Sequence, residues 1–248
     1  MAQNAPSAKV ALVTGAARRI GAEISRTLHD AGMNIIVHYH SSQEDAHRLC
    51  EQLNHQRAHS AIAIPALLGE KGSEKILIEK AMAVWGRLDA LVNNASRFYR
   101  TKIGEVEDAA WDDLMNSNLK SPFFLAEAAA PALSLVQGCI VNITDVHAER
   151  SLRDYAVYCI SKSGLLMMTR ALAKEWGPSV RVNAVAPGAV MWPEGENVMS
   201  VVEKNKVIER TALKRHGEPH DIASAVLFFI RDATYVSGQV LNIDGGRS

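Results

Sequence analysis

The chain has 248 residues, of which 48% are hydrophobic and 22% are charged, and its 27 basic and 27 acidic side chains leave no net charge. This composition is typical of a globular protein with a sizeable core, and the length allows one large α/β domain or two small ones. The balanced charge gives no sign of nucleic acid or of an anionic membrane surface as a partner. No apolar run approaches the length of a membrane span.

The start of the chain and its cysteines indicate the cytoplasm. Residues 1–9 lack the apolar core of a signal peptide. Cys50, Cys139 and Cys159 are odd in number and lack the spacing of a zinc site, which favours reduced thiols. We therefore expect a cytoplasmic protein that holds no metal.

Seven short apolar runs predict strands that are buried on both faces of a sheet. They lie at residues 10–14, 34–38, 61–64, 88–93, 139–144, 180–186 and 240–243. Stretches with helical periodicity separate them, at residues 20–32, 42–55, 76–84, 111–135, 155–176 and 221–230. Within the stretch 111–135, Pro122 and Pro131 should bend or break the helix.

This alternation runs without a linker, a change of composition or an internal repeat. It predicts a single α/β domain over residues 1–248, with a doubly wound, Rossmann-type fold and a seven-stranded parallel sheet. A segment at about residues 188–210 interrupts the pattern, with its Pro- and Gly-containing part at 191–200. This segment is either a plain surface loop or a lid, and its apolar residues, among them Trp192, favour a lid that contacts the substrate.

The turn after the first strand has the composition of a dinucleotide site. Residues 14–21 read Thr-Gly-Ala-Ala-Arg-Arg-Ile-Gly, at the place where a doubly wound sheet binds a pyrophosphate. Arg18 and Arg19 stand in the first turn of a helix, where the helix dipole disfavours cations, so a bound phosphate would explain them. The alternative is a pair of solvated surface arginines. The other residues expected at this site are Gly15, Ile20 and Gly21.

The end of the second strand indicates which dinucleotide is bound. An enzyme that uses NAD usually places an acidic residue here, on the ribose 2′-hydroxyl. This chain instead has His38, Tyr39, His40 and Ser41, with no carboxylate before Glu44. Imidazoles and hydroxyls suit a 2′-phosphate, so NADP is favoured. A metal site at the two histidines is the alternative, but no further ligands with suitable spacing accompany them.

A tyrosine and a lysine form the candidate catalytic pair. Tyr158 and Lys162 are four residues apart, which brings their side chains onto one face of a helix. A nearby ammonium stabilises a phenolate and lowers the pKa of the phenol, as an acid/base tyrosine requires. Asp145, at the end of the strand before this helix, completes the group. The alternative for the pair is a core tyrosine beside an exposed lysine.

Together these motifs resemble the short-chain dehydrogenase/reductase family along nearly the whole chain. The matching residues are the turn 14–21, Asn93-Asn94-Ala95, Asn118, Tyr158-x-x-x-Lys162 and Pro187-Gly188. The resemblance implies that Tyr158 is the catalytic acid and that Lys162 lowers its pKa and holds the nicotinamide ribose. It also implies that Asn118 supports a proton-relay water, and that the protein is a homotetramer. The further residues it places on the cofactor are Asn93, Ala95, Ser96, Pro187 and Gly188.

Within that family the chain is similar to the pteridine reductases. Most family members have a serine thirteen residues before the catalytic tyrosine, where this chain has Asp145. Arg19 in the glycine-rich turn, the His38-Tyr-His run and residues 93–98 match the same branch. The resemblance implies that Asp145 acts in catalysis and that Phe98 stacks a pterin against the nicotinamide. It also assigns Ser96 and Tyr155 to the pterin pocket.

Two positions depart from that branch, and both concern the adenosine end of the cofactor. Ser41 stands where a basic residue is common, and Leu67 replaces an aspartate that usually holds the adenine. Arg19, His40 and Ser41 would therefore have to bind the 2′-phosphate.

These features favour an NADPH-dependent reductase of dihydrobiopterin, dihydromonapterin or dihydrofolate. Asp145 supports this reading because a carboxylate can accept an N–H of a pterin or pass on a proton, whereas a serine polarises an oxygen; alternatively, it only pairs with a basic neighbour such as His147. The competing functions are a carbonyl reductase, for example a 3-oxoacyl-[acyl-carrier-protein] reductase, and a non-catalytic NADP-binding sensor. The presence of both Tyr158 and Lys162 argues against the sensor.

Overall fold

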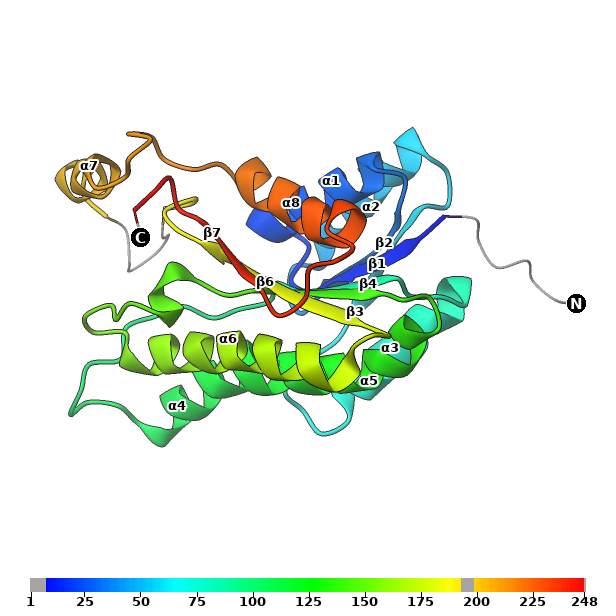
Figure 1. Ribbon diagram of the computed structural model, residues 1–248, viewed down its shortest axis with the longest axis horizontal. Coiled ribbons are helices and arrows are strands. Elements are labelled where there is room, and N and C mark those ends of the chain that lie inside the picture. Colours follow the sequence, from blue (N-terminus) through cyan, green and yellow to red (C-terminus); the bar gives the residue numbers. More distant parts are fainter. Residues whose placement is uncertain (1–7, 193–198, 248) are drawn as a thin grey trace, which may run out of the picture.

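Seven parallel strands form one sheet in the computed structural model, which describes residues 8–192 and 199–247 (Figure 1). Their spatial order is β3-β2-β1-β4-β5-β6-β7. Their bounds are β1 Val10–Val13, β2 Asn34–Tyr39, β3 Ala61–Pro65, β4 Ala90–Asn93, β5 Cys139–Ile143, β6 Arg181–Pro187 and β7 Val240–Ile243. The predicted single α/β fold with a seven-stranded parallel sheet is confirmed. The strand order reverses between β1 and β4, where a fold of this type has its ligand crevice.

Helices cover both faces of the sheet. Their bounds are α1 Arg19–Asp30, α2 Gln43–Gln56, α3 Ser73–Trp85, α4 Asp108–Met115, α5 Ser121–Ser134, α6 Ala156–Trp176, α7 Val201–Glu209 and α8 Pro219–Leu227. In Figure 1, α1, α2 and α8 lie above the sheet, and α3, α5 and α6 lie below it. The strands are therefore screened from water on both sides, which explains why their sequences read as continuous apolar runs.

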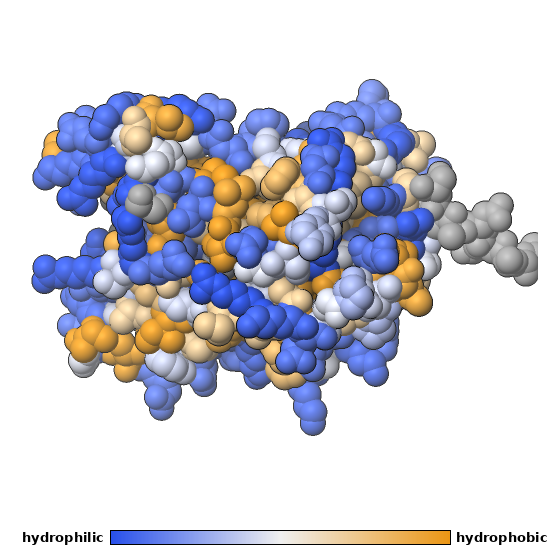
Figure 2. All heavy atoms as spheres, in the orientation of Figure 1, coloured by the Kyte–Doolittle hydropathy of each residue, from blue (hydrophilic) through white to orange (hydrophobic). Residues whose placement is uncertain are grey.

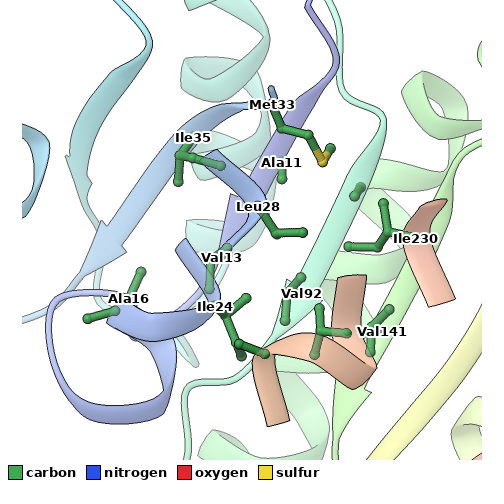
Figure 3. Packing of buried hydrophobic residues seen from close by; sticks show 14 of the residues in the cluster. Ala11, Val13, Ala16, Ile24, Leu28, Met33, Ile35, Val92, Val141 and Ile230 are labelled. Carbon is green, nitrogen blue, oxygen red and sulfur yellow. The ribbon is translucent and has the colours of Figure 1, made fainter. Parts of the chain in front are cut away.

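Two clusters of buried side chains hold these layers together. Ala11 and Val13 of β1 pack with Ile24 and Leu28 of α1 on one face of the sheet (Figure 3). On the other face, Leu12 belongs to the cluster that contains side chains of α3, α5 and α6. Each fully buried side chain of this size contributes roughly 1.5–3 kcal/mol to folding. The sheet is therefore a rigid base for the residues at its carboxyl edge.

The predicted helix at 111–135 is divided differently from expectation. A five-residue π-helical segment, Asn116–Lys120, separates α4 from α5. Pro122 lies in the first turn of α5, where its missing N–H would have no partner in any case. Pro131 lies inside α5, which continues to Ser134, so the break expected there is absent. The π-helical segment contains Asn118, in keeping with the frequent occurrence of such segments at functional sites.

Helix α7 was not expected from the sequence pattern. It starts with a capping box in which the Ser200 hydroxyl accepts from the Glu203 amide, and the Glu203 carboxylate accepts from the Ser200 amide. None of its residues is buried, and in Figure 2 the helix, at the upper left, is mostly blue with a few orange residues. Local capping therefore defines this helix more than core packing does.

Three further features concern the cysteines, the length of the helices and the possible metal ligands. Cys50, Cys139 and Cys159 are buried and unpaired. Within residues 8–192 and 199–247, no helix has the length and apolar character that a membrane crossing requires. The same residues contain no group of three or more histidine, cysteine, aspartate or glutamate side chains arranged to hold a metal ion.

Candidate active site

Two cavities meet at the carboxyl edge of the sheet, beside the point where the strand order reverses. One of about 400 Å³, the catalytic cavity, is lined by Asp145, Tyr158 and Lys162. The other, of about 380 Å³, is the turn cavity and lies against the glycine-rich turn after β1. The residues that line both cavities are Arg19, Ile20, Asn94 and Ser96. The two cavities therefore share one wall, and together they form one continuous candidate site.

Close backbone contacts shape the glycine-rich turn. Gly15 has φ +59°, and a Cβ atom on it would lie 3.0 Å from Ala95 Cα. A Cβ atom on Gly21 would lie 2.3 Å from the carbonyl oxygen of Gly15, so α1 can approach the turn only with glycine there. The side-chain Nδ2 atom of Asn94 donates to the carbonyl oxygens of Thr14 at 2.8 Å and Gly15 at 3.1 Å. The sequence motif included Asn94 without assigning it a role, and these hydrogen bonds show that it holds the glycine-rich turn in place.

The lining of the turn cavity fits the phosphates of a dinucleotide. Arg18, Arg19, His40, Ser41 and Ser42 supply cationic, imidazole and hydroxyl groups to it, and none of the described carboxylates lines it. Arg18 Nε also lies 3.6 Å from an Asp45 carboxylate oxygen. The position of Arg18 is therefore explained in part by this ion pair. Arg19 also has a protein partner, since its Nη2 atom donates to the carbonyl oxygen of Trp192 at 3.3 Å. The lining also includes the expected residues Gly15, Ile20, Gly21, Tyr39, Ala95 and Ser96.

The expectation that His38 binds the cofactor is corrected by the structure. Its ring is buried and lines neither cavity. Nδ1 accepts from the Gly15 amide at 3.1 Å, and Nε2 donates to the carbonyl oxygen of Ala66 at 3.1 Å. Burial lowers the pKa of His38 to about 4, so the ring is neutral and both nitrogens are used by the backbone. His38 supports the glycine-rich turn from beneath.

Replacing His38 with Asn should make the protein less sensitive to acid. The unfolded chain protonates this histidine near pH 6.5, whereas the folded chain does so only near pH 4, so stability is lost as the pH falls between these values. Between pH 7 and 5 this amounts to about 2 kcal/mol. Urea unfolding of the wild type and of His38→Asn at pH 7 and pH 5 measures this loss of unfolding free energy. Equal losses in the wild type and in His38→Asn would contradict the assignment.

Asn93 also lies away from both cavities. Its side chain is buried, and Nδ2 donates to the Oδ1 atom of Asn142 at 2.8 Å. The Asn93 side chain therefore braces β4 against β5, and the predicted place of Asn93 beside the cofactor remains a prediction. Pro187 and Gly188 line the catalytic cavity, and their contact with the cofactor remains a prediction. A Cβ atom on Gly188 would lie 2.6 Å from Asp244 Cβ, so glycine lets the end of β6 approach the C-terminal segment.

Tyr158 and Asp145 are in direct contact. The Tyr158 hydroxyl donates to Asp145 Oδ2 at 2.7 Å. The other carboxylate oxygen, Oδ1, accepts from the backbone amide of His147 at 2.8 Å. The His147 ring is turned elsewhere, with Nδ1 3.1 Å from the carbonyl oxygen of Arg150. Asp145 is therefore held by backbone and aimed at the tyrosine, and the alternative of a pair with the His147 side chain is wrong.

Lys162 is buried beneath this pair. Its Nζ atom donates to the carbonyl oxygen of Ile143 at 2.9 Å and lies 5.8 Å from the centre of the Tyr158 ring. Burial lowers the pKa of Lys162 to about 8, and the Asp145 carboxylate opposes this shift. The amine is therefore charged below about pH 8 and can donate to a ligand in the cavity.

The pKa of Tyr158 differs from the expectation. Burial raises this pKa well above 10, and the charge and hydrogen bond of Asp145 raise it further. The expected lowering by Lys162 is therefore not seen in the structure. Tyr158 stays a neutral phenol that holds its proton until a stronger base forms in the cavity, which is the state that a proton donor needs.

Asn118 connects the loop after β4 to α6. Its Oδ1 atom accepts from the Arg97 amide at 2.8 Å and the Ser96 hydroxyl at 3.0 Å. Its Nδ2 atom donates to the carbonyl oxygen of Arg97 and to the Ser161 hydroxyl, both at 3.0 Å. Asn118 is fully buried and lines neither cavity. These contacts position Ser96 and Phe98, and the proton-relay role remains a prediction.

Phe98 stands at the catalytic cavity with tyrosines on two sides. Its ring stacks on Tyr155, with centroids 4.6 Å apart and planes 14° apart, and meets Tyr158 edge-on at 4.8 Å. Phe98 is 37% exposed and lines the cavity, whereas Tyr155 is buried and lines neither cavity. Tyr155 was expected to line the pterin pocket. In the structure it packs behind Phe98 and does not line the catalytic cavity.

The segment that the sequence predicts as a lid is only partly described. Trp192 lines the catalytic cavity, stacks on His216 at 4.4 Å and lies under Lys204 Nζ at 5.6 Å. Residues 193–198 of the expected lid lie outside the described residues. Further residues that line the cavity, and that the sequence motifs did not indicate, are Thr144, Val146, Leu152, Met199, Val207 and Arg247. That Thr144 and Val146 line the cavity could have been inferred from their place just after β5. Met199 and Val207 lie beside and within α7, which the sequence pattern did not predict.

The fold and the site define an oxidoreductase that uses a nicotinamide dinucleotide. The family model described as Enoyl-(Acyl carrier protein) reductase matches residues 15–248. The chain belongs to the short-chain dehydrogenase/reductase family.

Three relatives illustrate the range of this similarity. A protein of Streptomyces violaceoruber, provisionally named ketoacyl reductase 2 of the granaticin polyketide synthase, is 34% identical over 99% of this chain and 98% of its own. The 3-oxoacyl-[acyl-carrier-protein] reductase FabG of Staphylococcus epidermidis is 33% identical over 96% of this chain and 98% of its own. Pteridine reductase 1 of Leishmania tarentolae is 33% identical over 98% of this chain and 97% of its own.

Proposed function

We propose that the chain is an NADPH-dependent pteridine reductase, which reduces a dihydropterin to its tetrahydro form. The substrates would be dihydrobiopterin or dihydromonapterin, and also dihydrofolate. The observation that carries the proposal is the 2.7 Å hydrogen bond from the Tyr158 hydroxyl to Asp145, at the position where the family resemblance predicts a serine. Phe98 at the cavity adds an aromatic face for a flat ring.

The residues of this chain can supply the proton that the reduction requires. A bound nicotinamide cofactor supplies the hydride. Tyr158 offers a neutral O–H, and Asp145 can accept an N–H of the ring or take part in returning a proton to the tyrosine. Lys162, charged below about pH 8, stabilises negative charge that forms on the phenol during transfer. A ketone substrate needs no such carboxylate, because its oxygen only accepts.

The turn cavity supports NADPH over NADH. Arg19, His40 and Ser41 line it, and among the residues that the structure describes no carboxylate stands there to hold a free 2′-hydroxyl. A 2′-phosphate would accept charge-assisted hydrogen bonds from these groups.

Reduction of 3-oxoacyl thioesters is the second candidate, because two of the relatives described above are named as ketoacyl reductases. The experiment that separates the candidates is NADPH oxidation by the purified protein, with dihydropterins, dihydrofolate and β-keto esters offered separately. The proposal requires turnover of the dihydropterins at least tenfold above that of the β-keto esters. The opposite order would reject it.

Substitution of Phe98 by Ala should raise the KM for dihydropterins about three- to tenfold, because the stacking contact with the ring is lost. The KM for NADPH should change by less than twofold. Steady-state kinetics with each substrate varied in turn measures both constants. Phe123→Ala is the matched control, since Phe123 is a partly exposed phenylalanine of α5 that lines neither cavity. A change confined to the cofactor KM would show that Phe98 does not contact the pterin.

A further inference from the structure

A third cavity, also of about 400 Å³, opens beside the catalytic cavity. We call it the basic cavity, and its lining residues are Val146, His147, Arg150, Ser151, Arg210, Asp244 and Arg247. Three of these residues, Val146, His147 and Arg247, also line the catalytic cavity. A molecule with its ring beside Tyr158 could therefore extend a tail into the basic cavity.

The three arginines of the basic cavity come from separate segments of the chain. Arg150 follows the short 3-10 helix Val146–Ala148, Arg210 ends α7, and Arg247 lies in the C-terminal segment after β7. Arg150 Nη1 donates to the carbonyl oxygen of Arg247 at 3.1 Å, which joins two of these segments. The dipole of α7 by itself favours a cation at Arg210, so the argument depends chiefly on Arg150 and Arg247.

The charge of the basic cavity is unbalanced. One carboxylate, Asp244, faces the three guanidinium groups. In the described part of the chain, no side-chain ion pair involves Arg150, Arg210 or Arg247. Each guanidinium has five N–H donors, and Arg150 uses one Nη atom on a carbonyl oxygen. Donors therefore remain for a planar anion such as a carboxylate or for a phosphate.

We propose that the basic cavity binds an anionic group, carboxylate or phosphate, on the tail of the substrate that is reduced beside Tyr158. This inference rests on the proposed function and narrows it, because it selects dihydropterins with a charged tail over those with a neutral one. Dihydrofolate carries glutamate carboxylates, and a phosphorylated dihydroneopterin carries phosphate. Dihydrobiopterin has the same ring with an uncharged side chain.

The kinetic test compares these three substrates in the full-length protein. The ratio of kcat/KM for each anionic substrate to that for dihydrobiopterin should fall about five- to tenfold in Arg150→Gln and in Arg247→Gln. Arg153→Gln removes a charge from the same loop outside the basic cavity and should keep the wild-type ratio. If the kcat/KM ratio falls for dihydrofolate alone, the cavity binds carboxylates. If the ratio falls for the phosphorylated pterin alone, the cavity binds phosphate. An unchanged ratio for both would overturn the inference.

Direct binding separates this inference from the proposed function. Calorimetric titration with p-aminobenzoylglutamate, which carries the carboxylates of folate without a pterin ring, needs no turnover. Binding that weakens at least fivefold in Arg150→Gln, but not in Arg153→Gln, supports an anion site even if no pterin is reduced. Absent binding, or equal binding by all three proteins, counts against the site even if pterins are reduced.

Discussion

Replacement of Tyr158 by Phe should lower kcat about a thousandfold while the Kd for NADPH changes by less than twofold. The phenylalanine keeps the ring that packs against Phe98, and it removes only the hydroxyl that donates to Asp145. A positioned proton donor contributes about 10²–10⁴ to a rate, so its loss should appear in kcat and not in cofactor binding. Single-turnover kinetics and a fluorescence titration with NADPH measure the two quantities.

Tyr235→Phe provides the control for this experiment, because Tyr235 is fully exposed and lines neither the catalytic nor the turn cavity. It should retain the wild-type rate. Unchanged turnover in Tyr158→Phe would remove the tyrosine from the mechanism. A loss of NADPH binding equal to the loss of rate would mean that its main role is to hold the cofactor.

Substitution of Asp145 by Ser should lower kcat/KM for dihydropterins about a hundredfold or more and leave reduction of β-keto esters equal or faster. Serine is the residue that the family resemblance predicts here, and its hydroxyl can polarise a carbonyl oxygen. It cannot accept and return a proton through the 2.7 Å contact with Tyr158. The pKa of Tyr158 should also fall, since the Asp145 charge is one of the causes that raise it.

Asp145→Asn separates the shape of this side chain from its charge. The amide oxygen can still accept from Tyr158, but the group neither carries charge nor takes up a proton at neutral pH. If activity with pterins survives in Asp145→Asn, the carboxylate only positions the tyrosine. If it is lost as in Asp145→Ser, the charge or the proton is required.

The fold was predictable because the strands are covered on both faces, so each appears in the sequence as an apolar run. The catalytic group was predictable for a related reason. The i, i+4 spacing of Tyr158 and Lys162 and the strand end at Asp145 are local features, and they converge at one sheet edge. The composition of the first turn indicated Arg19, and the family resemblance indicated Ser96 and Phe98; all three line the catalytic cavity.

Features that depend on burial were not predictable. Because His38 lies near the C-terminal end of β2, the sequence suggested that it binds a phosphate. In the structure its ring is buried and accepts a hydrogen bond from the backbone amide of Gly15. The direction of the Tyr158 pKa follows from desolvation, which the spacing of residues does not reveal. Tyr155 lies one turn before Tyr158, but its ring is covered by Phe98. The homotetramer and the preference for NADPH remain predictions.

The most direct test of the account offers both kinds of substrate to the enzyme in one reaction. Purified protein is incubated with NADPH that carries deuterium at the transferred C4 position, together with equal concentrations of dihydrobiopterin and an acetoacetyl thioester. Mass spectrometry then locates the label. The account predicts deuterium on a ring carbon of tetrahydrobiopterin. Deuterium found only in the 3-hydroxyacyl product would contradict it and assign the site to ketone reduction.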